Sequence, residues 1–408
     1  MPSSAVISAY QRRLIAFLSV ATFFEGYDFY AMAQILPNLR ADFGLTKADA
    51  GWLMAAVNFG TMIAALVIRR ADAWGRRRVL TVTIIGYTLC SLATAFAPNV
   101  WSFAALQLAG RVFLIGEWAI AMVIAAEEFP AEKRGLVIGV IQACSSLGTI
   151  TCAGVVPLLV TMPWGWRTVY VVGAIPLAII AYARRGLRET RRFQEQVAAG
   201  EERKPFIAIL KGPYRGRVLE LALIWCILYV ATQNAITVWK DFAVTERGWS
   251  DGQVGLSLTI AAVAAMPPIF FVGKLLDVLG RRRGAVVIFT LTAIGIFLAY
   301  TLQSRLGLTV GLVLGMFGVS AVLPVMNAYT TERFPTELRG DAFAWANNLL
   351  GRIGYVGSPI LLGTLAESAG WGPVLAWTAV CPIVALALIL VRLPETRGRE
   401  LEETSALH

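Results

Sequence analysis

Charged side chains are scarce in this sequence. Only 15% of its 408 residues are Asp, Glu, Lys or Arg, and 57% are hydrophobic, whereas soluble domains carry about 25% charged residues. The charges that do occur are gathered in short clusters between long uncharged stretches. This composition excludes an ordinary soluble domain and indicates a chain that crosses a membrane several times.

Histidine is nearly absent, and cysteine shows no clustering. The one histidine is His408, the last residue. The five cysteines lie singly in apolar segments without C-x-x-C spacing, namely Cys90, Cys144, Cys152, Cys226 and Cys381. We therefore expect no disulfide framework, no metal site and no cofactor. An enzyme embedded in the membrane would need a nucleophile, a metal cluster or a cofactor motif, and the predicted spans contain neither a histidine nor a cluster of cysteines, so we do not expect an enzyme. Proton chemistry inside the membrane would have to use carboxyl groups.

The two halves of the sequence repeat each other. EEFPAEKRG at 127–135 matches ERFPTELRG at 332–340 in six of nine positions. The same offset of 205 residues superimposes DAWGRRR at 72–78 on DVLGRRR at 277–283. Two matches that share one offset, close to half of the chain length, predict an internal duplication. A duplicated chain with long apolar segments is typical of a membrane transporter.

Twelve segments are long and apolar enough to cross about 30 Å of hydrocarbon, six in each half. The predicted spans are residues 14–36, 49–68, 79–98, 101–125, 136–160, 168–184, 218–239, 252–273, 284–303, 307–330, 341–364 and 371–392. The predicted fold is therefore an all-α membrane protein whose twelve transmembrane helices form two pseudo-symmetric six-helix bundles. The predicted domains are 1–184, a cytoplasmic linker at 185–217, and 218–408 with a short cytoplasmic tail.

The basic residues predict the orientation. The net charge is +10, and Lys and Arg gather in the linker and in the loops after the even-numbered spans, as at Arg76–Arg78 and Arg281–Arg283. This is the positive-inside pattern and not a nucleic-acid-binding surface. We expect a multi-pass protein of the bacterial inner membrane with both termini in the cytoplasm, an amphipathic linker and an uncleaved first span.

The loop motifs carry a family resemblance. Asp72-x-x-Gly75-Arg76-Arg77 and Asp277-x-x-Gly280-Arg281-Arg282 resemble the paired loop motif of the major facilitator superfamily. Glu127-x-x-Pro130-x-x-x-Arg134-Gly135 and Glu332-x-x-Pro335-x-x-x-Arg339-Gly340 resemble the second paired motif of its sugar and metabolite porters, and LRETRR (187–192) and LPETRG (393–398) resemble the motif that ends each half. One departure is Ile68, where the first-half motif usually has glycine. The resemblance covers the whole chain and implies a transporter that works by alternating access.

Charge and turn chemistry predict what the loop residues do. A carboxylate, a glycine turn and a guanidinium group at a helix end can form a charge-assisted network. Such a network can hold the two halves in one state and release them in another. The predicted conformational latch comprises Asp72, Gly75, Arg76, Glu127, Arg134, Asp277, Gly280, Arg281, Glu332 and Arg339. The alternative for these residues is a plain positive-inside anchor.

Ionisable residues inside the spans are candidates for function because their burial is costly. Glu25 and Asp28 lie three residues apart on one face of the first span. Gly26-Tyr27-Asp28 resembles the first span of sugar and aromatic-acid porters, which implies a part for Asp28 in proton coupling. Burial favours the protonated carboxyl group and a nearby cation favours the ionised one, so such a group can switch near neutral pH. The predicted proton-coupling residues are Asp28, Glu25 and Glu117. A structural ion pair is the alternative for Asp28.

The fourth span contains Arg111 and Glu117. Arg111 is expected either to pair with Asp28 or to bind substrate, although the family usually has arginine at the place of Gln107. Glu117 lies six residues further on, well off the face of Arg111. It is either a polar packing partner or a second proton site.

Three other spans carry polar stripes, which suggest a shared water-accessible cavity. Gln142, in the fifth span with Ser146 and Thr149, falls where sugar porters have a glutamine that contacts the sugar. Ser and Thr are more often contacts between helices. The residues predicted to bind substrate are Arg111, Gln142, Tyr229, Gln233, Asn234, Asn348, Arg352 and Tyr355.

These patterns favour a secondary active transporter, with proton-coupled symport of a small organic metabolite as the first hypothesis. Two arginines in a cavity suit an organic acid, because a carboxylate can bind a guanidinium group through two hydrogen bonds. A hexose is disfavoured because the glutamine-rich seventh-span motif of sugar porters is absent. The alternative is proton-coupled efflux of drugs or metabolites by antiport. The expected partners are the small-molecule substrate, protons and the lipid bilayer, with no nucleic acid and a monomeric state.

Overall fold

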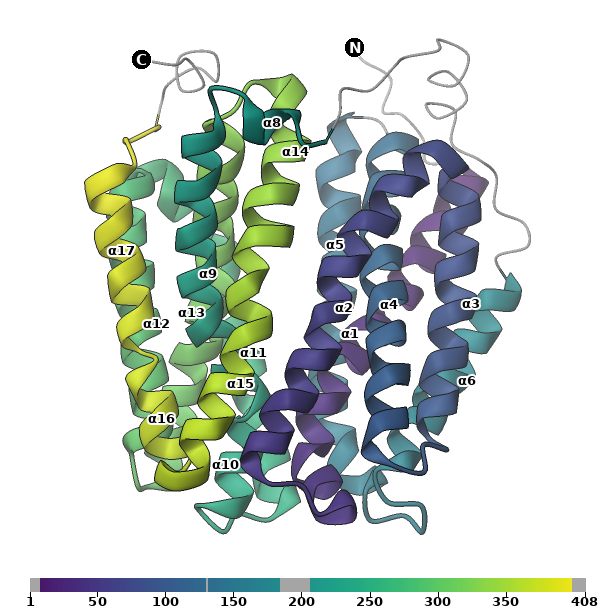
Figure 1. Ribbon diagram of the computed structural model, residues 1–408. Helices are drawn as coiled ribbons and strands as arrows, with labels where there is room; N and C mark the ends of the chain where they lie inside the picture. The colour runs from purple at the N-terminus through teal and green to yellow at the C-terminus, as the bar shows by residue number, and fades with distance from the viewer. Residues whose placement is uncertain (1–7, 130, 184–205, 398–408) are drawn as a thin grey trace. The chain divides into compact units, whose positions relative to one another are not determined.

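The computed structural model describes the backbone of residues 8–129, 131–183 and 206–397. These residues form helices joined by short connections, and no β-strand occurs in the ranges described (Figure 1). The expectation of an all-α fold is therefore confirmed. The tail after residue 397 and most of the predicted linker lie outside the described residues.

The helices of the first half overlap the six spans predicted there. They are α1 (Ala9–Phe43), α2 (Lys47–Trp74), α3 (Arg76–Thr94), α4 (Val100–Glu128), α5 (Ala131–Leu159) and α6 (Arg167–Ala183). Gly75 separates α2 from α3 with a positive φ of 94°. A residue with a side chain rarely adopts this backbone conformation, so glycine is required at the turn.

The second half contains both long helices and short helical turns. Its elements are α8 (Ala208–Lys211), α9 (Arg215–Thr237), α10 (Trp239–Thr245), α11 (Asp251–Leu279), α12 (Arg281–Thr301), α13 (Arg305–Glu332), α14 (Arg339–Phe343), α15 (Arg352–Ala369), α16 (Trp371–Trp377) and α17 (Val380–Arg392). A 3₁₀ turn spans Thr336–Leu338, and a π-helix spans Ala344–Gly351. The sequence pattern predicts a regular helix there, so the π-helix is a difference that bears on the site.

Nine stretches of the described helices are long and apolar enough to cross a membrane. They correspond to the second, fourth, fifth and seventh to twelfth predicted spans. A membrane crossing by α1, α3 and α6 stays a prediction. Charged residues such as Glu25 and Asp28 lower the mean hydropathy of α1, and α6 is only 17 residues long.

The helices form two compact units. The first contains α3 to α6 with most of α1 and α2, and the second contains α8 to α17 together with the segment Arg40–Ala55. This segment comprises the end of α1 and the start of α2, which the sequence assigned to the first domain. The division at 1–184, 185–217 and 218–408 stays a prediction, because most of the linker lies outside the described residues.

Glycines bring α1 and α5 into close contact within the first unit. A Cβ atom added to Gly148 would lie 1.8 Å from the carbonyl oxygen of Phe23, and one added to Gly26 would lie 2.1 Å from the carbonyl oxygen of Ser145. Small residues allow helix backbones to approach closely in membranes, where packing and not water exclusion drives association. This contact fixes the part of α1 that carries Asp28.

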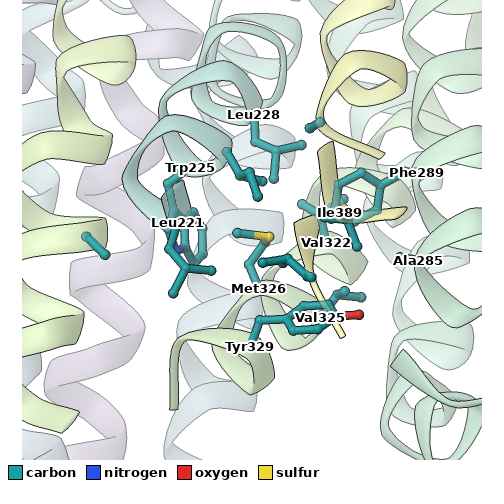
Figure 2. Packing of buried hydrophobic residues seen from close by; sticks show 14 of the residues in the cluster. Leu221, Trp225, Leu228, Ala285, Phe289, Val322, Val325, Met326, Tyr329 and Ile389 are labelled. Atoms are coloured by element: carbon teal, nitrogen blue, oxygen red, sulfur yellow. The ribbon is translucent and has the colours of Figure 1, made fainter. Parts of the chain in front are cut away.

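The second unit has a continuous apolar core. Figure 2 shows the cluster in which side chains from α9, α12, α13 and α17 meet, including Trp225, Phe289, Met326 and Ile389. The indole of Trp225 donates a hydrogen bond of 3.1 Å to the hydroxyl of Thr330. The core therefore fixes α9, whose next turn carries Tyr229.

Candidate functional site

Asp28 lies in the interior of the first unit, where its carboxylate accepts two hydrogen bonds. The hydroxyl of Tyr87 donates to Oδ2 of Asp28 at 2.5 Å, and the hydroxyl of Ser91 donates to the same oxygen at 3.0 Å. The other oxygen, Oδ1, is buried without a hydrogen-bond partner among the described residues. One oxygen of the carboxylate is therefore held, and the other is available to a proton.

Arg111 lines the same small cavity as Asp28. Its guanidinium carbon lies 4.3 Å from the centre of the Phe29 ring, and its Nη1 is buried without a hydrogen-bond partner in the described part of the chain. No direct ion pair joins Arg111 to Asp28. The cavity has room for about one water molecule. The carboxylate and the guanidinium group thus share an enclosed space while each keeps bonding capacity.

Glu25 and Glu117 are also buried, at 2% and 0% exposure. Both interact electrostatically with the hydroxyl of Tyr87, as Asp28 does. The three carboxyl groups predicted to carry protons therefore lie within electrostatic range of Tyr87 of α3, and Asp28 is the one that accepts its hydrogen bond. Sequence reasoning missed Tyr87 and Ser91, because an uncharged residue in an apolar span carries no signal that separates it from a packing residue.

Arg352 is the centre of an aromatic cluster in the second unit. Its guanidinium carbon lies 5.2 Å from the ring centre of Tyr355 and 5.9 Å from that of Tyr229. The two tyrosine rings meet edge to face with their centres 5.4 Å apart. The Nε of Arg352 is buried and has no hydrogen-bond partner among the described residues. Three of the predicted substrate residues, Tyr229, Arg352 and Tyr355, are thus brought together, and Arg352 keeps one vacant donor.

The π-helix changes which asparagine meets this cluster. The hydroxyl of Tyr229 donates a hydrogen bond of 2.6 Å to Oδ1 of Asn347. The stripe predicted from the sequence contains Asn348, four residues before Arg352. A π-helix has about one residue more per turn than an α-helix. Because the π-helix ends at Gly351, directly before Arg352, Asn347, five residues before Arg352, contacts the cluster in place of Asn348. Asn348 is half-buried, and its contact with substrate stays a prediction.

The other predicted substrate residues have different surroundings. Asn234 is buried and donates 2.7 Å and 2.8 Å hydrogen bonds to the hydroxyl of Ser358 and the carbonyl of Val230. Gln233 donates to the hydroxyl of Thr237 at 3.1 Å, one turn along the same helix. Gln142 is exposed on α5. Asn234 is therefore committed to packing contacts, whereas the side chain of Gln142 is accessible.

The predicted latch of the second unit forms a network that includes a third motif. Nη2 and Nε of Arg281 donate to Glu332 Oε1 at 2.9 Å and 3.2 Å, and Nη1 pairs with Asp277 at 3.4 Å. The hydroxyl of Thr396 donates to the other oxygen of Glu332 at 2.5 Å. Glu395 accepts hydrogen bonds from the backbone amides of Arg281 and Arg282 at 2.8 Å and 2.9 Å.

Glu395 therefore occupies the start of α12, directly after Gly280, whose φ is 85°. Burial alone raises the pKa of a carboxyl group, but hydrogen bonds from four backbone amides outweigh it and lower the pKa of Glu395 below its usual range. Sequence reasoning found the motif that contains Glu395 and assigned it no role. The sequence could not place this carboxylate at the start of α12, because Arg281 and Glu395 are 114 positions apart; an acid is favourable there because it faces the positive end of the helix dipole.

The residues of the predicted latch in the first unit are described only in part. Nη2 of Arg76 lies 3.3 Å from Oε1 of Glu127, and Gly75 forms the turn before α3. The side chains of Asp72 and Arg134 lie outside the described residues. In the second unit, Nε of Arg339 donates to the carbonyls of Thr331 and Phe334 at 2.9 Å and 3.1 Å, so it terminates α13.

A group of ion pairs in the second unit was not predicted. Nη1 of Arg40 lies 2.5 Å from Oδ2 of Asp241, which is fully buried and also accepts a 2.6 Å hydrogen bond from the indole of Trp371. Nζ of Lys47 lies 2.6 Å from Glu246. These contacts bind the segment Arg40–Ala55 to α10 and α16. Partners about 200 residues apart give no pattern in a single sequence.

Glu246 is the centre of one of these contacts. Burial alone raises its pKa, but the hydrogen bond from Lys47 and those from the backbone amides of Gly372 and Trp371 outweigh it, so its pKa lies below the usual value of 4.5. The group therefore stays ionised in the folded protein at neutral pH.

The chain is similar to known transporters over nearly its whole length. A gallate transporter of Pseudomonas putida is 28% identical in an alignment of 443 residues, gaps included. The alignment covers 98% of this chain and 95% of the relative. A niacin transporter of Acinetobacter baylyi is 24% identical over 429 residues, 97% of each chain. A D-xylose–proton symporter of known structure superposes with a TM-score of 0.80 at 16% identity, covering 96% of this chain and 100% of that one.

The family profile described as Major Facilitator Superfamily matches residues 18–243 and 221–407. The two matches together cover nearly the whole sequence, as the internal repeat predicts. The chain is a multi-pass membrane transporter, and it belongs to the major facilitator superfamily.

Proposed function

We propose that this transporter couples the inward movement of protons to the uptake of a small organic acid by alternating access. The observation that carries the proposal is the buried carboxyl group of Asp28, which has one oxygen held by Tyr87 and one oxygen without a partner. A carboxyl group is costly to bury at membrane depth, which makes Asp28 a candidate for function. Arg111 faces the same cavity.

The chemistry of the cavity supports a proton switch at Asp28. The ionised carboxylate is favoured by the hydroxyl donors of Tyr87 and Ser91 and by the charge of Arg111, and the protonated form is favoured by burial. Binding of a proton at Oδ1 removes the negative charge that Arg111 faces. Arg111 can then bind an anionic substrate. One guanidinium group thus links proton binding to substrate binding.

The aromatic cluster supports an organic acid as the substrate. A planar guanidinium group binds a carboxylate through two hydrogen bonds, and Arg352 has a vacant donor at Nε. The ring of Tyr229, which is half-buried, offers a face on which an aromatic substrate can stack. The named substrates of two relatives, gallate and niacin, are both aromatic carboxylic acids.

The cellular setting belongs to the same proposal. Both termini lie on the cytoplasmic side, as the loop charges predict, and the protein works as a monomer in a bacterial inner membrane. The networks around Arg76 and Arg281 act as latches between its conformations.

The proton role is tested with Asp28→Asn in proteoliposomes. With a pH gradient imposed, the variant is expected to lose uphill accumulation of radiolabelled gallate or niacin but to keep exchange of the same compound across the membrane, which needs no proton. Asp49→Asn is the matched control, since Asp49 is an exposed carboxylate at the start of α2. Uphill uptake by Asp28→Asn at the rate of the control would refute the coupling role.

A further inference from the structure

A groove of about 450 Å³ lies where the start of α12 meets the end of α17. Three arginines line it, namely Arg282, Arg283 and Arg397. A side-chain nitrogen of Arg282 donates to the carbonyl of Leu390, which joins the two helices. None of the three guanidinium groups forms an ion pair with a residue that the structure describes. The role of the groove is not explained by the transport site.

The acid in the groove does not neutralise these arginines. Glu395 is the one carboxylate among the lining residues. Both of its oxygens accept hydrogen bonds from backbone amides, four in all. Three positive groups and one negative group leave two positive charges facing the groove. An anion of one or two charges is the complementary ligand.

The groove has an apolar wall beside its charges. Leu279, Val286 and Leu390 line it, and Val286 is 40% exposed. The membrane-spanning stretches of the two helices begin at Arg281 and end at Arg392. The arginines therefore lie at the level where hydrocarbon gives way to headgroups, and the apolar wall extends from them toward the hydrocarbon.

We propose that this groove binds an anionic phospholipid, with its phosphate among Arg282, Arg283 and Arg397 and its acyl chains along Val286 and Leu390. A free phosphate ion would use the charges but leave the apolar wall exposed, so an amphiphile fits the groove better. Basic pockets at the end of membrane helices recognise lipid headgroups by the same chemistry.

A bound lipid also acts on the neighbouring latch. Arg397 directly follows Thr396, whose hydroxyl holds Glu332, and Arg282 directly follows Arg281. A phosphate that bridges Arg282 and Arg397 ties the segment after α17 to the start of α12. The lipid therefore stabilises the network formed by Arg281, Glu332 and Thr396.

The test measures lipid binding to the purified full-length protein by native mass spectrometry, with phosphatidylglycerol and phosphatidylcholine as probes. The groove variant is the double change Arg283→Gln and Arg397→Gln, since both side chains are exposed and hold no described contact. The control is Arg392→Gln, an exposed arginine of the same boundary that does not line the groove.

Wild-type protein is expected to bind phosphatidylglycerol in preference to phosphatidylcholine. The double variant is expected to bind phosphatidylglycerol about thirtyfold more weakly, because each basic residue near an anionic lipid contributes roughly a factor of five. The control should keep wild-type affinity. Equal losses in the variant and the control, or no preference in the wild type, would overturn the proposal.

A thermal-shift arm separates a lipid from a soluble anion. Phosphatidylglycerol is expected to raise the melting temperature of the wild type more than phosphatidylcholine does, and inorganic phosphate should leave it unchanged. The same rise with inorganic phosphate would assign the groove to a soluble anion and refute the lipid.

Discussion

Replacement of Arg352 by lysine separates the shape of the guanidinium group from its charge. Lysine keeps the positive charge but loses the planar fork that binds a carboxylate through two hydrogen bonds. It also loses the flat face that lies 5.2 Å from the ring centre of Tyr355. Arg352→Lys therefore tests whether the substrate carboxylate sits on this residue.

The expected magnitude follows from the lost contacts. A hydrogen bond to a charged group contributes about 1.5–3 kcal/mol, and lysine replaces two such bonds by one at best. The dissociation constant of the substrate should therefore rise about tenfold to a hundredfold. The structure of the second unit should persist, because Nε of Arg352 has no described hydrogen-bond partner to lose.

The assay is calorimetric titration of the purified wild-type protein with a panel of aromatic carboxylates, dicarboxylates and sugars. The ligand that binds the wild type most tightly is then titrated into the variants. Arg305→Lys is the matched control, because Arg305 also lies over an aromatic ring, 5.7 Å from the centre of Trp249, and is exposed at the start of α13. Affinity within twofold of wild type in Arg352→Lys would refute the placement of the carboxylate. A sugar as the tightest ligand would refute the organic acid.

Three further changes test other parts of the structure. Tyr87→Phe removes the 2.5 Å donor to Asp28 and should shift the pH dependence of uptake while leaving protein yield unchanged; an identical pH profile would contradict the contact. Gly148→Ala places a Cβ 1.8 Å from a backbone oxygen of α1 and should destabilise the first unit by about 1–3 kcal/mol, seen as a lower melting temperature, whereas Gly139→Ala on the same helix has open space and should not. Glu246→Gln should lower the melting temperature at pH 7. Because the folded pKa of Glu246 lies below 4.5, its contribution is complete above that pH and is lost as the pH falls through the folded value, so the difference from wild type should shrink in acid; a difference independent of pH would rule out the ionised contact.

The sequence predicted those features that depend on rarity or repetition. Asp28, Arg111 and Arg352 could be selected because charges are rare inside membrane spans, and the loop motifs could be selected because they occur twice. The structure buries or half-buries each of these three residues beside aromatic groups. Rarity identified the centres of both clusters, while their roles remain proposals.

The partners of those residues could not be predicted in the same way. Tyr87 and Ser91 lie about 60 residues from Asp28 along the chain, and hydroxyl groups in spans more often serve helix packing. Asn347 was missed for a different reason, because a stripe drawn at 3.6 residues per turn fails where the backbone becomes π-helical. Single-sequence periodicity assumes the helix type that it is used to detect.

The contact network around Glu332 gives a physical reason for the repetition of three motifs. Arg281 comes from the first motif, Glu332 from the second and Thr396 from the third, and these side chains meet although they span 116 positions of the chain. The guanidinium group of Arg281 and the carboxylate of Glu332 form an ion pair, and removal of one partner from a largely buried pair is costly. Loss of the first or the second motif would remove one half of this pair, and loss of the third would remove the hydroxyl that donates to Glu332. The first half carries the same three motifs, and Arg76 meets Glu127 there at 3.3 Å. Because the three motifs meet in one network, repetition of the whole set, more than of any one motif, is what the proposed latch predicts.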